Sequence, residues 1–234
     1  ADPASSAAAR CRDVEQRIRQ NAAVAPEPIR RAVRDEALVQ AMREKLLRAQ
    51  LRRVAAALAQ PGIDALLMKG TALAYGLYPD PALRPRADTD IVVAPTARAA
   101  AQRALHDLGY RRGHGPAGSC VGYQVELSRV DTSGETTLDL HWRVSNAQSF
   151  AWLFTHAELA ASALPVPALG PQARRLGDAH ALAVALLHRA GNNRFVAAGF
   201  GDRLIWLYDI HLLAAAIGAE DRAHFRDLVV ARRI

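Results

Sequence analysis

Three aspartates stand where strand geometry would bring their carboxylates together. Asp88 and Asp90 form an Asp-Thr-Asp sequence directly before a short β-branched run, and Asp139 stands in a Leu-Asp-Leu-His-Trp sequence that ends in His141-Trp142. Alternate residues of a strand point to the same face, so Asp88 and Asp90 project together, as do Asp139 and His141. Carboxylate oxygens suit Mg2+, and a pair of such ions can neutralise the attacking and leaving oxygens of an in-line displacement at phosphorus. The aspartates therefore predict phosphoryl chemistry at a divalent-metal site.

The neighbouring residues predict the strands that would position these carboxylates. The β-branched run after Asp90 stops at Ala94-Pro95, as a short buried strand does. Polar and apolar side chains alternate over residues 137–144, which predicts a strand with one polar face and one core face. Taken alone, an Asp-x-Asp pair before a strand is most often a turn or a cap. Asp139 argues against that simpler interpretation, because burying an unpaired carboxylate costs several kcal/mol.

A Lys69-Gly70-Thr71 sequence lies upstream of both segments. It follows the apolar run Leu66-Leu67-Met68 and precedes a helix-forming stretch, so we expect a strand, a tight turn and a helix. Glycine lets a backbone approach a ligand closely, and a helix N-terminus offers free N–H groups to phosphate. The alternative is a simple turn after a solvated lysine. The aspartates downstream favour the phosphate-binding interpretation.

Several stretches, in this order and spacing, resemble a bacterial family of nucleotidyltransferases within the polymerase-beta-type superfamily. The resemblance covers about residues 60 to 215, and its motifs occupy residues 67–74, 78–85, 88–93, 138–142 and 203–211. In the broad superfamily the Gly-Ser/Thr turn lies closer to the Asp-x-Asp pair than it does here. The narrower family shares the longer spacer of this chain.

The resemblance implies a metal-dependent transferase that moves a nucleoside monophosphate group from a nucleoside triphosphate and releases pyrophosphate. We expect ATP binding, and the motifs do not identify which triphosphate is the donor. The acceptor would be a hydroxyl or phosphate of a small molecule, a protein or an RNA, and the motifs do not distinguish among these. Asp88, Asp90 and Asp139 would be catalytic residues that hold two Mg2+ ions, or Mn2+ in their place. Asp139 would also act as the general base or assist it.

The resemblance also implies the contacts to the triphosphate. Gly70 and Thr71 would bind it at the turn, while Lys69 and Arg84 would neutralise its charge, Arg84 with the better fork geometry. His141 shares a face with Asp139, so it could touch the acceptor or orient that aspartate, and a purely structural hydrogen bond is an equally good interpretation.

The fold class expected is α/β (α+β), a small mixed β-sheet nucleotidyltransferase core between N-terminal helices and a C-terminal helical region. We expect residues 1–60 to form the N-terminal helical region, 61–148 the core and 149–234 the C-terminal helical region. Within them we expect helices over 11–20 and 28–60, with Pro61-Gly62 as the break.

Finer expectations concern the core and the C-terminal region. Thr96 is expected to cap a helix that runs to Gly109, and residues 121–130 and 137–144 to pair as a hairpin. Asn192-Asn193 is expected in a loop near the acceptor. Asp209, in an apolar helix, is expected to pair with Arg203 or with a histidine such as His188, which like His180 we interpret as a packing residue.

Composition limits the classes of protein. The chain has 234 residues, 50% of them hydrophobic, and a formal net charge of +7, which permits a polyanionic partner without indicating one. Cys11 and Cys120 are too isolated for a zinc site or a disulfide framework, which favours a reduced, cytoplasmic setting. No membrane-spanning or signal segment is expected.

Two other classes of function compete with the enzyme. A catalytically silent nucleotide-binding or scaffold protein of the same fold would not need to keep all three aspartates and the Gly-Thr turn. A nucleic-acid-binding module would need an arginine-rich face interleaved with aromatic residues, and aromatic residues make up only 6% of the chain. Both alternatives are weaker than the transferase.

Overall fold

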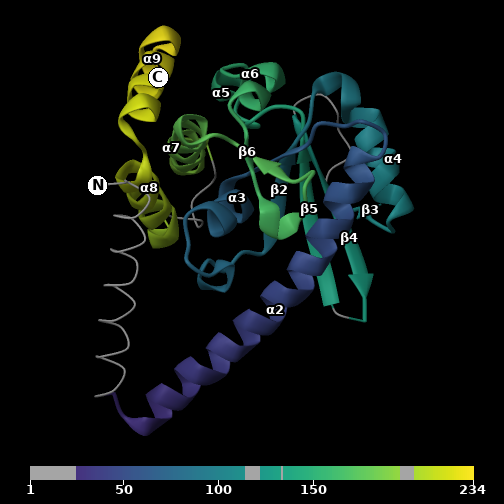
Figure 1. Ribbon diagram of the computed structural model, residues 1–234, viewed down its shortest axis with the longest axis vertical. Helices are drawn as coiled ribbons and strands as arrows, with labels where there is room; N and C mark the ends of the chain where they lie inside the picture. Colours follow the sequence, from purple (N-terminus) through teal and green to yellow (C-terminus); the bar gives the residue numbers. More distant parts are fainter. Residues whose placement is uncertain (1–24, 114–121, 133, 196–202) are drawn as a thin grey trace.

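The computed structural model describes residues 25–113, 122–132, 134–195 and 203–234, and its centre is one mixed β-sheet (Figure 1). The sheet has seven strands in the order β3-β4-β5-β2-β1-β7-β6. The strands are β1 (Leu66–Met68), β2 (Asp88–Val92), β3 (Arg111–Arg112), β4 (Gln124–Asp131), β5 (Gly134–His141), β6 (Leu164–Pro165) and β7 (Arg174–Arg175). The predicted mixed α/β fold is confirmed.

Helices cover both faces of this sheet. They are α2 (Glu27–Ala59), α3 (Lys69–Gly76), α4 (Arg98–Asp107), α5 (Gln148–Ala151), α6 (His156–Ala161), α7 (Asp178–Phe195), α8 (Leu204–Ala216) and α9 (Ala219–Arg232). Short 3₁₀ turns lie at Pro81–Leu83, Pro95–Ala97 and Pro167–Leu169. Among the described residues, no helix combines the length and the hydropathy needed to cross a bilayer.

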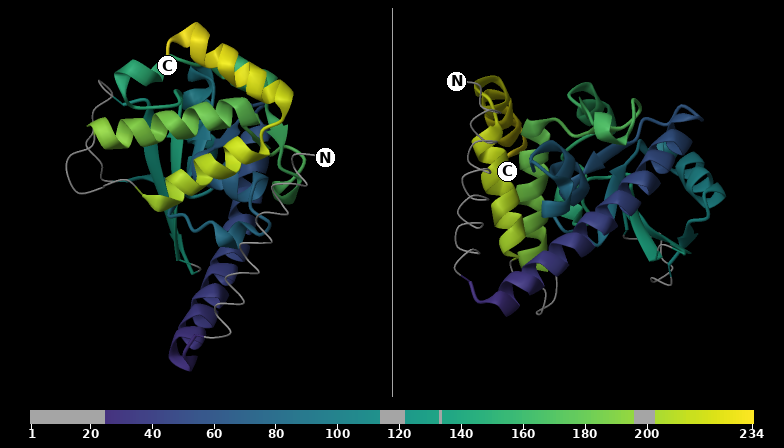
Figure 2. Two further views of the ribbon diagram at one scale, coloured as in Figure 1. Left: turned by 90° about the vertical axis from the view of Figure 1, so that its left-hand side faces the viewer. Right: turned by 60° about the horizontal axis from the view of Figure 1, so that its bottom comes forward.

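The alternation of side chains along the central strands builds two cores. Leu67 and Ile91 pack into one core with α2 and α4, while Leu66, Met68 and Val92 pack into the other with α7 and α8. Figure 2 shows α2 and α4 on one side of the sheet and α7, α8 and α9 on the other. The central strands are therefore buried on both faces, which explains their short, continuously apolar sequences.

Strand pairing brings the distant chemical motifs together. β2 lies between β1, to which it is antiparallel, and β5, to which it is parallel. In this register Asp90 lies opposite Met68 on one side and opposite Asp139 on the other. The expected hairpin is present as β4 and β5.

The long helix α2 begins at Glu27 and ends at Ala59, close to the predicted bounds. Its second half buries Leu51, Val54 and Leu58 against the sheet, whereas its first half extends away from it (Figure 1). Gly62 follows with a φ of +76°, a backbone conformation that glycine adopts without strain. The helix predicted over 11–20 lies outside the described residues.

Three local expectations are corrected. Thr96 does not cap a helix, because it lies inside the 3₁₀ turn and α4 then begins at Arg98 without a side-chain cap. Asn192 and Asn193 belong to α7 and form no loop. The C-terminal part is not purely helical, since the β6–β7 hairpin joins the edge of the sheet beside β1. The division at residues 60 and 148 stays a prediction.

Candidate active site

The carboxylates of Asp90 and Asp139 face each other across the parallel pair β2 and β5. Ligand atoms of Asp90, Asp139 and His141 all lie within 4.8 Å of one another. Asp90 is buried, Asp139 is half-buried, and Asp88 is exposed at the start of β2. The expected meeting of the two aspartate motifs thus follows from the strand register, which gives every residue from Asp88 to Val92 a partner on β5.

Asp90 receives two partners on one oxygen. Lys69 Nζ donates to Oδ1 at 2.7 Å, and His141 Nε2 lies 2.9 Å from the same atom. Burial by itself would raise the pKa of Asp90, but the Lys69 ammonium and the bond from His141 outweigh it and hold the pKa below its usual range. Lys69 reaches this position from a left-handed backbone with a φ of +51°, which is strained for a residue other than glycine.

Asp139 has no such cationic partner among the described residues. Burial, together with the negative charges of Asp90 and Asp88, raises the pKa of Asp139 to about 7. Gln124 Nε2 donates to Oδ2 at 2.8 Å. The cluster thus concentrates more negative charge than one ammonium neutralises, and this fits a divalent cation held by carboxylate oxygens.

His141 positions Asp90, not Asp139. Its ring is fully buried, and burial together with the nearby Lys69 lowers its pKa to about 4. A neutral ring at pH 7 can hold Asp90 Oδ1 in place through Nε2. The expectation that His141 touches an acceptor is not supported, because no part of the ring is exposed.

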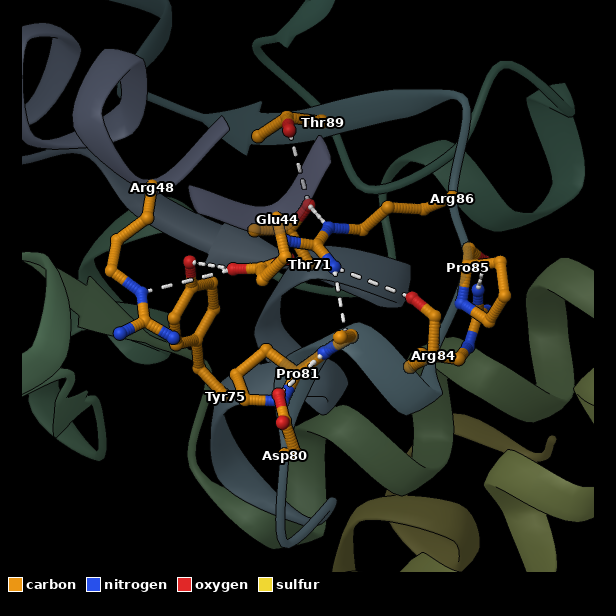
Figure 3. A network of polar contacts seen from close by, with 11 residues as sticks. Glu44, Arg48, Thr71, Tyr75, Asp80, Pro81, Arg84, Pro85, Arg86 and Thr89 are labelled. Carbon is orange, nitrogen blue, oxygen red and sulfur yellow. Dashed lines mark hydrogen bonds and ion pairs between the residues drawn. The ribbon is translucent and has the colours of Figure 1, made fainter. Parts of the chain in front are cut away.

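The Gly70-Thr71 turn is the start of α3. Residues 69–71 enter the helix directly from β1, so their backbone N–H groups lie among those that a helix leaves without intrahelical partners. The hydroxyl of Thr71 is engaged elsewhere, since Oγ1 lies 3.1 Å from Thr89 Oγ1 and accepts from Arg86 Nε at 3.1 Å (Figure 3). The whole of Thr71 is buried and it is not among the described lining residues of the cleft, so Gly70 is the residue of this turn that a phosphate can reach.

Lys69, Gly70 and the three aspartates line one cleft of about 880 Å³, which lies between the sheet and helices from both ends of the chain. Its described lining includes α2 at Gln40 and Arg43, and α7 at His188 and Asn192. The central lining residues are Lys69, Gly70, Arg84, Asp88, Asp90, Gln124 and Asp139. Substrate recognition can therefore involve the helices as well as the sheet.

Comparison with protein families agrees with this arrangement of carboxylates, turn and cleft. A family model described as uncharacterised nucleotidyltransferase matches residues 14–233. The chain belongs to this nucleotidyltransferase family. It is therefore an enzyme that transfers nucleotidyl groups, as the sequence predicted.

Solved structures share the fold of this nucleotidyltransferase. The solution structure of the antibiotic-resistance factor ANT(2'')-Ia has 13% sequence identity and a TM-score of 0.52, and the match covers 81% of this chain and 94% of that one. The crystal structure of ANT(2'')-Ia in complex with adenylyl-2''-tobramycin has 14% identity and a TM-score of 0.50, with 80% and 97% covered. No curated protein sequence matches the chain. At this identity the likeness shows the fold alone.

Arg84 of the nucleotidyltransferase is bound to Asp209, which corrects the predicted partner of that aspartate. Arg84 Nη2 donates to Oδ2 at 2.7 Å, and Nε lies 3.1 Å from both carboxylate oxygens. Tyr78 donates to Asp209 Oδ1 at 2.8 Å. A Cβ built on Gly70 would lie 3.4 Å from the guanidinium nitrogens, so Arg84 lies directly over the turn. Asp209 on α8 thereby fixes a basic group beside the expected phosphate site.

Sequence reasoning missed Arg86, Glu44 and Gln124. Arg86 Nη2 donates to Glu44 Oε2 at 2.8 Å, and Glu44 also accepts from Tyr75, so α2 is tied to the turn (Figure 3). The Arg-Pro-Arg sequence before Asp88 was the available signal for Arg86. No local signal identified Glu44, because its partners lie in other elements.

Proposed function

We propose that this nucleotidyltransferase moves a nucleoside monophosphate group, with ATP as donor, to a hydroxyl or phosphate of an acceptor bound in the cleft. The observation that carries the proposal is the Asp90–Asp139 pair on adjoining parallel strands, beside the N-terminus of α3 and at one open cleft. The adenylyl product bound to ANT(2'')-Ia supports ATP as the first donor to test.

Asp88, Asp90 and Asp139 are the residues that would hold Mg2+, two ions by the family resemblance, with Mn2+ as a substitute. Bound there, the metal supplies positive charge to the transferring phosphoryl group and lowers the pKa of the acceptor hydroxyl. The raised pKa of Asp139 supports this assignment, because it reports carboxylate charge without a counter-ion. His141 holds Asp90 in orientation for this role.

The triphosphate would lie at the turn. The backbone N–H of Gly70 would donate to phosphate at the positive end of α3. Lys69 would leave Asp90 to pair with phosphate oxygen, while Arg84 would contribute charge from its fixed place on Asp209. Thr71 would support the turn from within the core, since the whole residue is buried.

The reaction is an in-line displacement. The acceptor oxygen forms a bond to the α-phosphorus, the bond from that phosphorus to the bridging oxygen breaks, and pyrophosphate leaves with the electron pair. The proton of the acceptor hydroxyl would pass to the carboxylate of Asp139. Because bound metal would lower the pKa of that hydroxyl, a carboxylate of only modest basicity suffices as the base.

Binding of the four nucleoside triphosphates, each with and without Mg2+, tests the proposal on the parent protein and on Asp90→Ala. We expect metal-dependent binding of one triphosphate that the substitution abolishes, followed by pyrophosphate release once an acceptor is present. Binding by neither protein would favour a catalytically silent scaffold, and binding that ignores both metal and substitution would exclude the assigned site. A cytoplasmic location in a bacterium stays part of the proposal.

A further inference from the structure

The charged residues of the cleft are distributed unequally. Apart from Asp209 and the three aspartates of the proposed metal site, every charged residue in the described lining is basic. Asp209 is only 3% exposed and is held by Arg84 and Tyr78, so it cannot meet a ligand amine. The described walls thus offer a cationic acceptor no free carboxylate.

Two of the basic residues have no anionic partner among the described residues. Lys69 is paired with Asp90, Arg84 with Asp209 and Arg86 with Glu44. The remaining two, Arg43 on α2 and Arg203 at the N-cap of α8, are exposed and form no ion pair within the described part of the chain.

The wall near Arg203 is neutral and aromatic. The Arg203 guanidinium carbon lies 5.7 Å from the ring centroid of Trp206, and the His188 ring meets Trp206 edge-on with centroids 5.0 Å apart. Burial and the nearby Lys69 lower the pKa of His188 to about 4, so this histidine adds no charge at neutral pH. A partly exposed indole beside an unpaired guanidinium suits a planar ring that carries a phosphate.

We infer that the acceptor carries a phosphate group near the hydroxyl that receives the nucleotidyl group, and that Arg43 and Arg203 bind this phosphate. The inference rests on the proposed function, because the same cleft must hold the donor. Two sources present this chemistry: the end of a single-stranded nucleic acid and a free nucleotide.

The test measures binding to the full chain loaded with Mg2+ and a non-hydrolysable ATP analogue. The probes are a short fluorescein-labelled single-stranded RNA, AMP and the polycation spermine. We expect RNA or AMP to bind and spermine not to bind. Arg43→Ala/Arg203→Ala should weaken the binding of that ligand by at least about tenfold, and lower the salt slope for RNA by about 0.7, because the two arginines share one phosphate.

A matched control is Arg31→Ala/Arg103→Ala, which removes the same charge from two exposed arginines outside the described lining. The affinity of this control variant for RNA or AMP should stay within about twofold of that of the parent protein. Binding of RNA alone would assign a nucleic-acid end, and binding of AMP as well would assign a free nucleotide.

Three results would overturn the inference. They are binding of spermine in place of RNA and AMP, an equal loss of probe affinity in the control variant Arg31→Ala/Arg103→Ala, and loss of binding of the ATP analogue in Arg43→Ala/Arg203→Ala. The last would place these arginines on the donor. Failure of the parent to bind the analogue with Mg2+ is seen before any probe is added, and it would count against the proposed function itself.

Discussion

Two groups of carboxylates at the cleft differ in what neutralises them. Asp209 and Glu44 are each held by a buried arginine and a tyrosine hydroxyl. Asp90 and Asp139 lie beside a single ammonium, and the pKa of Asp139 rises to about 7 because burial and neighbouring carboxylates disfavour its charge.

One group of carboxylates holds the fold together, and the other group is available to bind a ligand. The arginine-held carboxylates join α2 and α8 to the segment between α3 and β2, so their charges are used within the fold. The strand carboxylates keep charge that the protein does not neutralise, which is costly unless a ligand supplies the cation. A deficit of positive charge therefore marks the site of reaction more clearly than burial does.

The largest expected effect follows from Asp139→Asn. Removing the base should lower turnover by about 10²–10⁴-fold while the fold is retained. Pyrophosphate release with a nucleic-acid or nucleotide acceptor measures it, and circular dichroism checks the fold. Glu135→Gln is the control, because Glu135 is an exposed carboxylate on the same strand, outside the described lining of the cleft. Equal turnover in the two variants would remove Asp139 from the mechanism.

Arg84→Met should destabilise the protein by about 3–5 kcal/mol, because it leaves the Asp209 charge buried without its partner. Urea unfolding gives the free energy. The double variant Arg84→Met/Asp209→Asn should recover a large share, since the unpaired charge is gone. A double variant no more stable than Arg84→Met would show that the pair does not act as a unit.

Lys69→Met should tighten Mn2+ binding by about tenfold in the absence of nucleotide, because the ammonium no longer competes for Asp90 Oδ1. Titration calorimetry measures it. Lys69→Gly should bind Mn2+ as tightly as Lys69→Met. Its free energy of unfolding should be about 1 kcal/mol higher than that of Lys69→Met, because glycine adopts the positive φ without strain. Unchanged metal affinity in both would mean that the Lys69–Asp90 pair does not limit access.

The smallest expected effect concerns His188, in the neutral wall of the cleft beside Trp206, and the pH dependence of stability. His188 has a pKa of about 4 when folded and about 6.5 when unfolded, so the unfolded chain binds more protons between these values. His188 therefore contributes a loss of stability as pH falls from 6.5 to 4, and His188→Gln should remove this contribution, at most about 1.4 kcal/mol for each pH unit in the range, whatever opposite contribution Asp139 makes in both proteins. Urea unfolding across that range tests it, with His106→Gln on the exposed face of α4 as control. Parallel curves for parent and His188→Gln would contradict the assignment.

Strand alternation and turn chemistry were sufficient to predict the elements that carry the candidate site. The β-branched run after Asp90, the alternation around Asp139 and the Lys-Gly-Thr turn are local patterns, and each gave the element that the structure contains. The roles of Thr71 and His141 were harder to predict from the sequence, because both side chains bond to partners in other strands or loops. The roles assigned to the site residues stay predictions until the variants are measured.

The amino-acid sequence by itself determined the strands that carry the aspartates, the presence of a helix directly after β1, and which family the chain resembles, because backbone periodicity and turn preference act over a few residues. The tertiary structure decided that Asp90 lies opposite Asp139, that Arg84 pairs with Asp209 across 125 positions, and that Glu44 meets Arg86. Such pairs depend on the parallel register of β2 and β5 and on the packing of distant helices. Charge balance in the cleft is therefore a property of the folded chain, since a carboxylate acquires its counter-ion only when the elements meet.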